Sequence, residues 1–306
     1  MRVVFMGTPE YGVPCLIALI DAGYDVVGVF TQPDKPSGRG KKMQSSPVKV
    51  CAVEHNIPVY QPLKIRVDGV EDLRALQPDV CVTAAFGQIL SQEVLDIPKM
   101  GTVNVHASLL PEYRGSSPIN WCLLNGEKVT GVTTMLTDKG IDTGDILQKA
   151  ECVIEEEDTT ATLTVKLAEL GAGLLIDTLK KLENGTCPRE KQNESKMSYY
   201  PMLKKEMGLL DFKKTAQQLV NQVRAFDPWP CAYLMVDGAP MKVWKAAVEE
   251  RTGTPGQILC ANAKEGLVIA AGEKALKVVE LQAQGGKRMR AQDYLRGHAL
   301  EQTNID

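Results

Sequence analysis

The first two-thirds of this 306-residue sequence alternate short apolar runs with helix-like segments. The apolar runs lie at residues 2–7, 25–32, 79–86 and 101–108. The helix-like segments include residues 13–22 and 70–76. Two later strands are expected at 130–137 and 146–154, followed by a long helix at 162–182. Such alternation is typical of βαβ units. We therefore predict an α/β fold with a mostly parallel sheet and helices on both faces.

The composition of the chain changes after residue 187. Residues 188–204 are polar, uneven and interrupted by prolines, which predicts a linker. One helix at 215–226 follows, and then five short strands at 232–236, 241–248, 256–261, 267–271 and 275–281. Short strands at close spacing favour a small β-barrel of the OB type. We expect an N-terminal domain at 1–187 and a C-terminal domain at 205–306.

Composition and cysteine spacing exclude several classes of protein. With 44% hydrophobic and 24% charged residues, the chain is an ordinary globular sequence. No stretch approaches the ~18 apolar residues of a membrane span, and residues 1–7 read as a first strand rather than a signal peptide. The eight cysteines lie far apart, without a C-x-x-C pair, so neither a metal site nor a redox motif is supported. A reduced, cytoplasmic setting is expected.

Charge gives no general attraction to nucleic acid. The net charge is −3, with 21 basic and 26 acidic residues in 1–204 and 14 basic and 12 acidic residues in 205–306. RNA binding would therefore need local clusters. One candidate is the long loop 33–47, PDKPSGRGKKMQSSP, with Arg39, Lys41 and Lys42; a second comprises Lys287, Arg288 and Arg290. From sequence alone, solvated surface is the better explanation for the loop, and the second cluster is either an RNA contact or plain surface.

Residues 103–115, VNVHASLLPEYRG, place two polar side chains in a run that otherwise reads as a buried strand. Side chains two apart on a strand share a face, so Asn104 and His106 point the same way. The carboxyl ends of parallel strands are where α/β proteins bind ligands, and buried polar groups there need partners. The alternative is a pair of satisfied polar residues that cap a loop.

A glycine-rich loop at residues 138–145, DKGIDTGD, carries three aspartates. One of them could orient His106 and favour its charged form, but sequence spacing does not say which. A solvated turn is the simpler explanation. The turn at residues 7–12 lacks G-x-G-x-x-G spacing, which argues against a nicotinamide-dependent dehydrogenase. His55 and His298 have no ligand spacing around them and are expected to be structural or surface residues.

These motifs together resemble the methionyl-tRNA formyltransferases of the folate-dependent formyltransferase superfamily. Asn104-x-His106-x-Ser108-Leu109-Leu110-Pro111-x-Tyr113-Arg114-Gly115 is similar to the folate formyltransferase motif. Gly140-x-Asp142-Thr143-Gly144 is similar to its catalytic-aspartate loop. The loop 33–47 resembles the insert of the tRNA enzymes. A Rossmann-like domain, a linker and a small barrel in that order also match, so the resemblance covers essentially the whole chain.

The resemblance implies formyl transfer from 10-formyltetrahydrofolate to initiator methionyl-tRNA, with a role in translation initiation. It implies that domain 1–187 binds folate and is catalytic, with a trio of Asn104, His106 and Asp142. It also implies that domain 205–306 binds tRNA, with further tRNA contacts from Arg39, Lys41 and Lys42. It also implies that the folate pocket is shaped by Ser108, Leu109, Leu110 and Pro111, with the pterin near the backbone of residues 86–90. We expect no metal and no membrane partner, and we expect a monomer.

The chemistry of formyl transfer suits these residue types. Addition of an amine to a formyl group creates an oxyanion, to which an amide such as that of Asn104 can donate. An imidazole can take the proton that the amine loses, or donate to the oxyanion once charged; both roles stay open for His106. The alternatives are a nucleotide-linked amino-sugar formyltransferase, a 10-formyltetrahydrofolate hydrolase and a non-catalytic RNA-binding protein. The basic loop and the intact trio argue against them.

Overall fold

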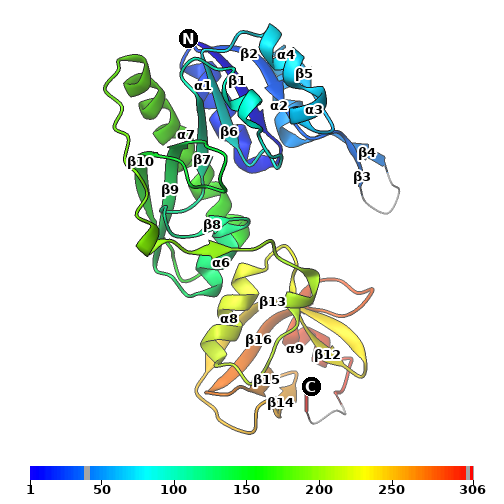
Figure 1. Ribbon diagram of the computed structural model, residues 1–306. Coiled ribbons are helices and arrows are strands. Elements are labelled where there is room, and N and C mark those ends of the chain that lie inside the picture. Colours follow the sequence, from blue (N-terminus) through cyan, green and yellow to red (C-terminus); the bar gives the residue numbers. More distant parts are fainter. Residues whose placement is uncertain (38–41, 301–303, 306) are drawn as a thin grey trace. The chain divides into compact units, whose positions relative to one another are not determined.

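The computed structural model describes residues 1–37, 42–300 and 304–305 of the chain. Contacts divide it into two compact units, coloured by sequence in Figure 1. The first unit comprises Met1–Gly115, Val129–Val153 and Thr164–Tyr200, and the second comprises Ser116–Lys128, Ile154–Leu163 and Pro201–Asp306. The predicted boundary at residue 187 assigns residues 116–128 and 154–163 to the N-terminal domain, whereas their contacts are with the C-terminal part of the chain.

A seven-stranded sheet forms the centre of the first unit, in the order β10-β9-β7-β6-β1-β2-β5. Its parallel strands are β1 (Arg2–Gly7), β2 (Asp25–Phe30), β5 (Val59–Tyr60), β6 (Val80–Ala84) and β7 (Thr102–His106). The antiparallel strands β9 (Val129–Leu136) and β10 (Ile146–Val153) extend the sheet beyond β7. The predicted α/β fold with a mostly parallel sheet is therefore confirmed.

Helices pack against this sheet. They are α1 (Val13–Asp21), α2 (Pro47–Glu54), α3 (Ile65–Asp68), α4 (Val70–Ala75), α5 (Gln92–Leu95) and α7 (Thr160–Glu183), with a 3-10 turn η1 (Glu10–Gly12) before α1. The side chain of Ser46 caps α2, where Pro47 occupies the first turn. Gly171 lets α7 approach the sheet closely, since a Cβ there would lie 2.9 Å from Cγ1 of Val105.

The predicted loop 33–47 contains a β-hairpin, which projects from the first unit in Figure 1. Its strands β3 (Lys35–Ser37) and β4 (Lys42–Gln44) pair antiparallel. At its base the Asp34 carboxylate accepts hydrogen bonds from Lys49 Nζ at 2.7 Å and Gln61 Nε2 at 2.8 Å. Arg39 and Lys41 lie outside the described residues, and for Lys42 only the backbone is described.

Much of the segment expected to be a linker is fixed on the first unit. Glu190 forms a β-bridge with Ile146, and residues Glu194–Lys196 form the 3-10 turn η2. The short strand β11 (Tyr199–Tyr200) then pairs in parallel with β8 (Arg114–Gly115), directly after the predicted catalytic strand and loop. Residues 190–200 therefore have a defined path beside the candidate site, which their polar composition did not predict.

The second unit combines helices α6 (Pro118–Leu124), α8 (Ala216–Ala225) and α9 (Ala291–Leu295) with the 3-10 turn η3 (Lys205–Gly208) and an antiparallel sheet. The sheet follows the order β12-β13-β16-β15-β14, and β17 (Met289–Arg290) pairs with β16. Its other strands are β12 (Ala232–Val236), β13 (Ala239–Glu249), β14 (Ile258–Asn262), β15 (Gly266–Ala270) and β16 (Ala275–Gln282). Among the described residues β12 and β14 do not pair with each other, so an antiparallel β domain is confirmed and a closed barrel is not.

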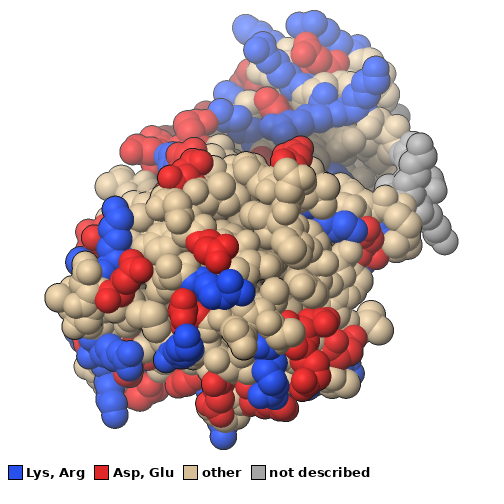
Figure 2. Space-filling model, turned by 90° about the horizontal axis from the view of Figure 1, so that it is seen from above, with Lys and Arg blue, Asp and Glu red and all other residues tan. Residues whose placement is uncertain are grey.

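The surface carries charges of both signs. Lysine and arginine side chains are interspersed with aspartate and glutamate side chains on the face drawn in Figure 2, in keeping with the net charge of −3. A search of the helices in the described part of the chain finds none that is both long and apolar enough to span a bilayer.

Candidate active site

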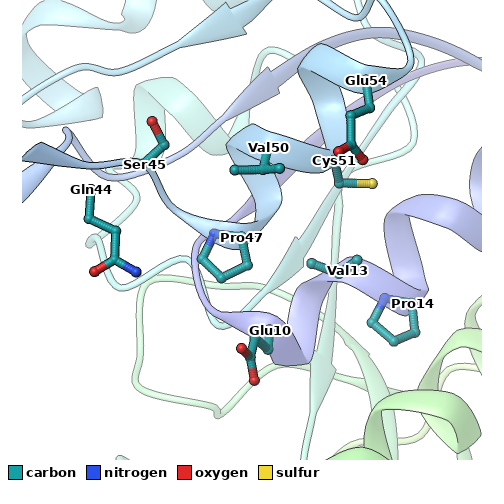
Figure 3. Close-up of a pocket in the computed structure, with 9 residues that line it drawn as sticks. All are labelled: Glu10, Val13, Pro14, Gln44, Ser45, Pro47, Val50, Cys51 and Glu54. Carbon is teal, nitrogen blue, oxygen red and sulfur yellow. The ribbon is translucent and has the colours of Figure 1, made fainter.

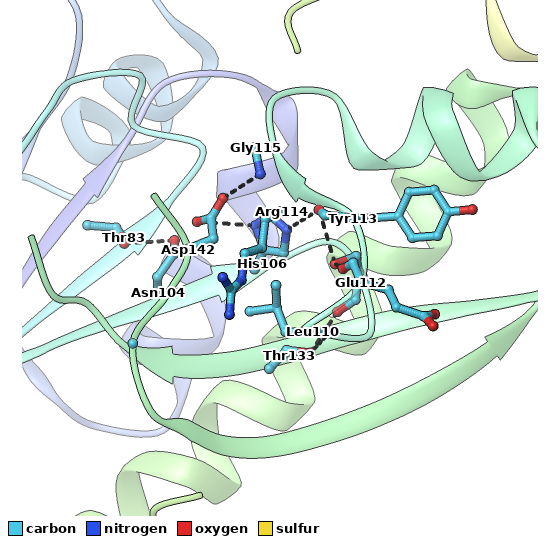
Figure 4. A network of polar contacts seen from close by, with 12 residues as sticks. Thr83, Asn104, His106, Leu110, Glu112, Tyr113, Arg114, Gly115, Thr133 and Asp142 are labelled. Carbon is cyan, nitrogen blue, oxygen red and sulfur yellow. Dashed lines mark hydrogen bonds and ion pairs between the residues drawn. The ribbon is translucent and has the colours of Figure 1, made fainter. Parts of the chain in front are cut away.

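His106 ends β7 and is almost fully buried, with 7% of its surface exposed. Its Nε2 atom lies 2.9 Å from the backbone oxygen of Tyr113, which the following loop returns to the strand end (Figure 4). A carbonyl oxygen only accepts hydrogen bonds, so Nε2 must carry a proton. In the neutral ring the Nδ1 lone pair is then available for proton chemistry.

Asp142 is the aspartate that faces this nitrogen. Its Oδ1 atom lies 3.6 Å from His106 Nδ1, and its Oδ2 accepts a hydrogen bond of 2.9 Å from the backbone N–H of Gly115. Asp138, by contrast, builds the loop itself, because its Oδ1 accepts from the Gly140 N–H and the Thr143 hydroxyl. Sequence spacing left this choice open and only the family resemblance pointed to Asp142; the fold of the loop places Asp142, and not Asp138, at His106.

Asn104 lies two residues before His106 on β7, on the same side of the strand. Its Oδ1 accepts a hydrogen bond of 2.8 Å from the hydroxyl of Thr83, the residue beside it on β6. With Oδ1 facing the Thr83 hydroxyl, the two Nδ2 hydrogens point elsewhere, and among the described residues they have no partner. Sequence analysis missed Thr83, although a polar residue near the end of the buried run 79–86 was a signal.

Residues 108–111 form a tightly bonded loop after β7. The Ser108 hydroxyl donates to the backbone oxygen of Glu112 at 2.8 Å, so it has a structural partner. The hydroxyl of Thr133 donates to the oxygen of Ser108 and accepts from the N–H of Leu110. Leu110 is fully buried in a cluster with Met135 and Ile146. Ser108 and Leu110 thus shape the loop from inside, while Leu109 and Pro111 are only partly buried.

Two hollows occur near the ends of the parallel strands. The smaller, about 270 Å³, is lined by Gln32, Leu63, Lys64, Arg66, Gly87, Gln88 and Ile89. It therefore includes part of the stretch 86–90 that was expected to meet the pterin. The larger, about 500 Å³, is lined by nine residues from η1, α1, α2 and the base of the hairpin (Figure 3). None of the predicted site residues lines it, so size alone does not locate the site.

Three of the remaining candidates, Arg288, His55 and His298, have local partners. Arg288 pairs with Glu280 at 2.6 Å, and its guanidinium lies 5.0 Å from the ring of Trp244. His55 contacts the backbone oxygen of Cys51 through Nδ1, and His298 does the same with Tyr294, as expected for structural residues. Within the described residues no three histidine, cysteine, aspartate or glutamate side chains are grouped to hold a metal ion.

Comparison with known proteins shows the family of this chain. The formyl transferase family matches residues 1–179, and the formyl transferase C-terminal domain family matches residues 202–299. The methionyl-tRNA formyltransferase of Geobacter metallireducens is 49% identical over 98% of this chain and 97% of its own length. The chain belongs to the methionyl-tRNA formyltransferase family. Another such relative, from Clostridioides difficile, is 47% identical over 98% of each chain.

More distant members of the formyltransferase superfamily share the fold. An N-formyltransferase from Helicobacter canadensis, solved with folinic acid and dTDP-3-aminofucose, superposes with a TM-score of 0.69 at 22% identity, covering 91% of this chain and 99% of its own. Phosphoribosylglycinamide formyltransferase from Bacillus halodurans matches 60% of this chain and 95% of its own, with a TM-score of 0.52 and 28% identity. The methionyl-tRNA formyltransferases differ from these structures in their level of sequence identity, which is 49% for the Geobacter metallireducens protein against 22% and 28%.

Proposed function

We propose that this protein transfers the formyl group of 10-formyltetrahydrofolate to the α-amino group of initiator methionyl-tRNA, for the initiation of translation. The proposal rests on one observation: His106 Nδ1 lies 3.6 Å from the Asp142 carboxylate, on the strand that also carries the Asn104 amide. It occurs in a chain about half identical to proteins named methionyl-tRNA formyltransferase. The folate supplies an activated formyl group, whose oxygen gains negative charge as the amine adds.

Asn104 stabilises that developing charge. Its oxygen is engaged by the Thr83 hydroxyl, so its Nδ2 hydrogens are the groups available to an oxyanion. A positioned donor of this kind typically contributes ~3–4 kcal/mol to the stability of the transition state. Because Asn104 belongs to a buried central strand, the donor is held in place before the reaction begins.

His106 accepts the proton that the amine loses, and Asp142 stabilises the protonated ring. Nε2 is committed to the carbonyl of Tyr113, so Nδ1 is the nitrogen that accepts the proton, and the adjacent Asp142 carboxylate stabilises the imidazolium that results. An α-amine has a pKa near ~8 and is already partly neutral at pH 7, so no covalent intermediate on the protein is required. The structural partner of the Ser108 hydroxyl agrees with direct transfer.

The two substrates approach from different elements of the first unit. The loop of residues Ser108, Leu109, Leu110 and Pro111 shapes the folate site, and the hollow lined by Gly87, Gln88 and Ile89 receives the pterin. Arg39, Lys41 and Lys42 lie in the sequence 33–47, and they contact the phosphates of the tRNA acceptor stem. The protein works in the cytoplasm, and it works as a monomer. Size-exclusion chromatography of the free protein tests the oligomeric state.

A competition between acceptors tests the proposal. Three parallel reactions each contain the protein and 10-formyltetrahydrofolate. The first also contains charged initiator tRNA, the second contains a nucleotide-linked amino sugar, and the third contains no acceptor other than water. We expect formyl transfer to the tRNA and little formate release. Preferential labelling of the sugar would support the amino-sugar alternative, and rapid formate release without acceptor would support the hydrolase. His106→Ala should lower kcat at least ~10²-fold in the productive assay.

A further inference from the structure

Gln192, in the segment expected to be a linker, is bonded to the backbone of the loop that carries Asp142. Its Nε2 donates one hydrogen bond to the oxygen of Asp142 and another to the oxygen of Gly144, each at 2.8 Å. The side chain therefore spans the loop on either side of Thr143 and uses both of its amide hydrogens. A single residue, 50 positions away in sequence, fixes the path of the loop at the aspartate itself.

Arg114 fixes the orientation of that amide. Its Nε and Nη2 donate to Gln192 Oε1 at 3.0 Å and 2.8 Å, and its Nη2 also lies 2.7 Å from Glu194 Oε1. A guanidinium has donors only, so the glutamine atom that faces it must be the oxygen. Arg114 is 3% exposed, so this contact is shielded from water. All the hydrogen-bonding positions of Gln192 are thus used in one arrangement.

The Asp142 loop needs such support. Asp142 has a φ of +53°, which lies in the left-handed region that residues other than glycine adopt uncommonly. Gly144 packs so closely on the backbone oxygen of Leu136 that no Cβ could be accommodated there. Residues held in such conformations persist only where their surroundings impose them. The two bonds from Gln192 impose the conformation at the carbonyl groups of residues 142 and 144.

The same segment also holds the other partner of His106. The Ser198 hydroxyl accepts a hydrogen bond of 2.8 Å from the N–H of Tyr113, and the rings of Tyr113 and Tyr200 stack with centroids 4.9 Å apart. Tyr200 pairs with Gly115, whose N–H bonds the Asp142 carboxylate. The backbone oxygen that binds Nε2 and the carboxylate that faces Nδ1 are therefore both attached to residues 192–200.

We propose that Gln192 is a positioning residue for formyl transfer, which holds the Asp142 carboxylate opposite His106 Nδ1 through the backbone of residues 142 and 144. The role rests on the proposed function, in which that carboxylate stabilises the imidazolium. Gln192 itself touches neither substrate. Its loss should therefore lower the rate of the chemical step rather than the affinity for folate or tRNA, since a displacement of about 1 Å can cost ~10²-fold in rate.

Two variants separate the contacts of Gln192. Gln192→Leu removes both donors and the acceptor. Gln192→Glu keeps the acceptor for Arg114 but presents a carboxylate oxygen to the two carbonyl oxygens. Both should lower kcat about 10- to 100-fold and leave both KM values within about 2-fold. Gln148→Leu is the matched control, because Gln148 bonds Asp177 and Thr178, which are not in the site. That variant should keep full kcat.

A double-mutant cycle and nuclear magnetic resonance decide whether the effect passes through Asp142. In an Asp142→Asn background, Gln192→Leu should cost less than about 2-fold. The ring-nitrogen signals of His106 should shift in both Gln192 variants, whereas those of His55 and His298, the other two histidines, should stay in place. Equal losses in both backgrounds, unchanged kcat, or unmoved His106 signals would overturn the proposal.

The failure of the proposed function would be recognised separately. If the unmodified protein does not formylate charged initiator tRNA, the function is wrong, and the His106 signals still test whether Gln192 positions Asp142. If the unmodified protein is active and the Gln192 variants keep full kcat with unmoved signals, the function stands and the positioning role is refuted. Thermal melts of the two variants show that each is folded at the assay temperature.

Discussion

His106 donates a hydrogen bond of 2.9 Å from Nε2 to the backbone oxygen of Tyr113, and this fixes which ring nitrogen can take part in proton transfer. The two residues are seven positions apart, and the loop between them folds back on the strand end. Nδ1 then faces Asp142 at 3.6 Å, across a gap slightly longer than a hydrogen bond. A proton accepted at Nδ1 would therefore lie between the imidazole ring and the Asp142 carboxylate, while the Tyr113 oxygen holds the opposite side of the ring.

Asn104→Ala should lower kcat ~10²- to 10³-fold, because the proposed oxyanion donor is lost. Thr83→Val keeps the shape of the neighbouring side chain but removes the bond that orients the amide. We expect a smaller loss of about 10-fold, with both KM values little changed. Steady-state kinetics of the two variants measure these effects. Full activity of Thr83→Val would show that the strand alone orients Asn104.

Removal of positive charge from the sequence 33–47 should weaken tRNA binding. Arg39→Ala combined with Lys42→Ala should raise KM for tRNA and reduce the slope of log affinity against log salt by about one to two units, since each phosphate contact contributes ~0.9. The folate KM should not change. Lys180→Ala combined with Lys181→Ala, in the last turn of α7, is the control that removes the same number of positive charges. An unchanged salt dependence in the double variant would mean that the hairpin is plain surface.

Asp79 should stabilise the fold at neutral pH and lose this effect in acid. Hydrogen bonds from the Arg2 N–H and from Lys99 lower the pKa of its carboxyl. A depressed pKa contributes stability above the unfolded value of ~3.9, and that contribution is lost as the pH falls through the folded value. Asp79→Asn should therefore melt at a lower temperature at pH 7, with a difference that shrinks in acid. A constant difference from pH 7 to pH 3 would contradict this.

The cysteines should fall into two classes of reactivity. Cys152, Cys187 and Cys260 are partly exposed, and the other five are buried. Burial raises the pKa of Cys15 to about 12 and that of Cys231 to about 11, so their reactive thiolates are scarce at pH 8. A thiol reagent should modify at most three sites in the native protein and all eight in denaturant. Mass spectrometry identifies them, and rapid modification of Cys15 would be incompatible with the described core.

A fragment ending at residue 204 should fold poorly. The Asn120 amide on α6 donates to the backbone oxygen of Ala225 at 2.6 Å, and a Cβ at Gly126 would lie 2.8 Å from the side chain of Asn221 on α8. The fragment keeps α6 and removes α8, which exposes the buried residues Ile119, Cys122 and Leu123. We expect aggregation or a markedly lower melting temperature than the full chain. A stable, monomeric fragment would show that α6 does not need α8.

The amino-acid sequence by itself determined the local parts of the structure. Strands such as 2–7 and 232–236 follow from apolar or alternating residues over a few positions, and helix ends follow from caps such as Ser46 and Thr215. These signals are read within one segment, because strand and helix periodicity depend on neighbouring residues. The common face of Asn104 and His106 is also a local property of one strand.

Only the tertiary structure decided which distant groups meet. Asp142 rather than Asp138 faces His106, Thr83 orients Asn104 from the next strand, and Gln192 reaches the Asp142 loop from a segment that reads as a linker. Each of these contacts joins residues 21 to 50 positions apart, as with Thr83 and Asn104 or Asp142 and Gln192. Pairings of this range depend on strand order and loop path, and periodicity within a segment carries no information about either.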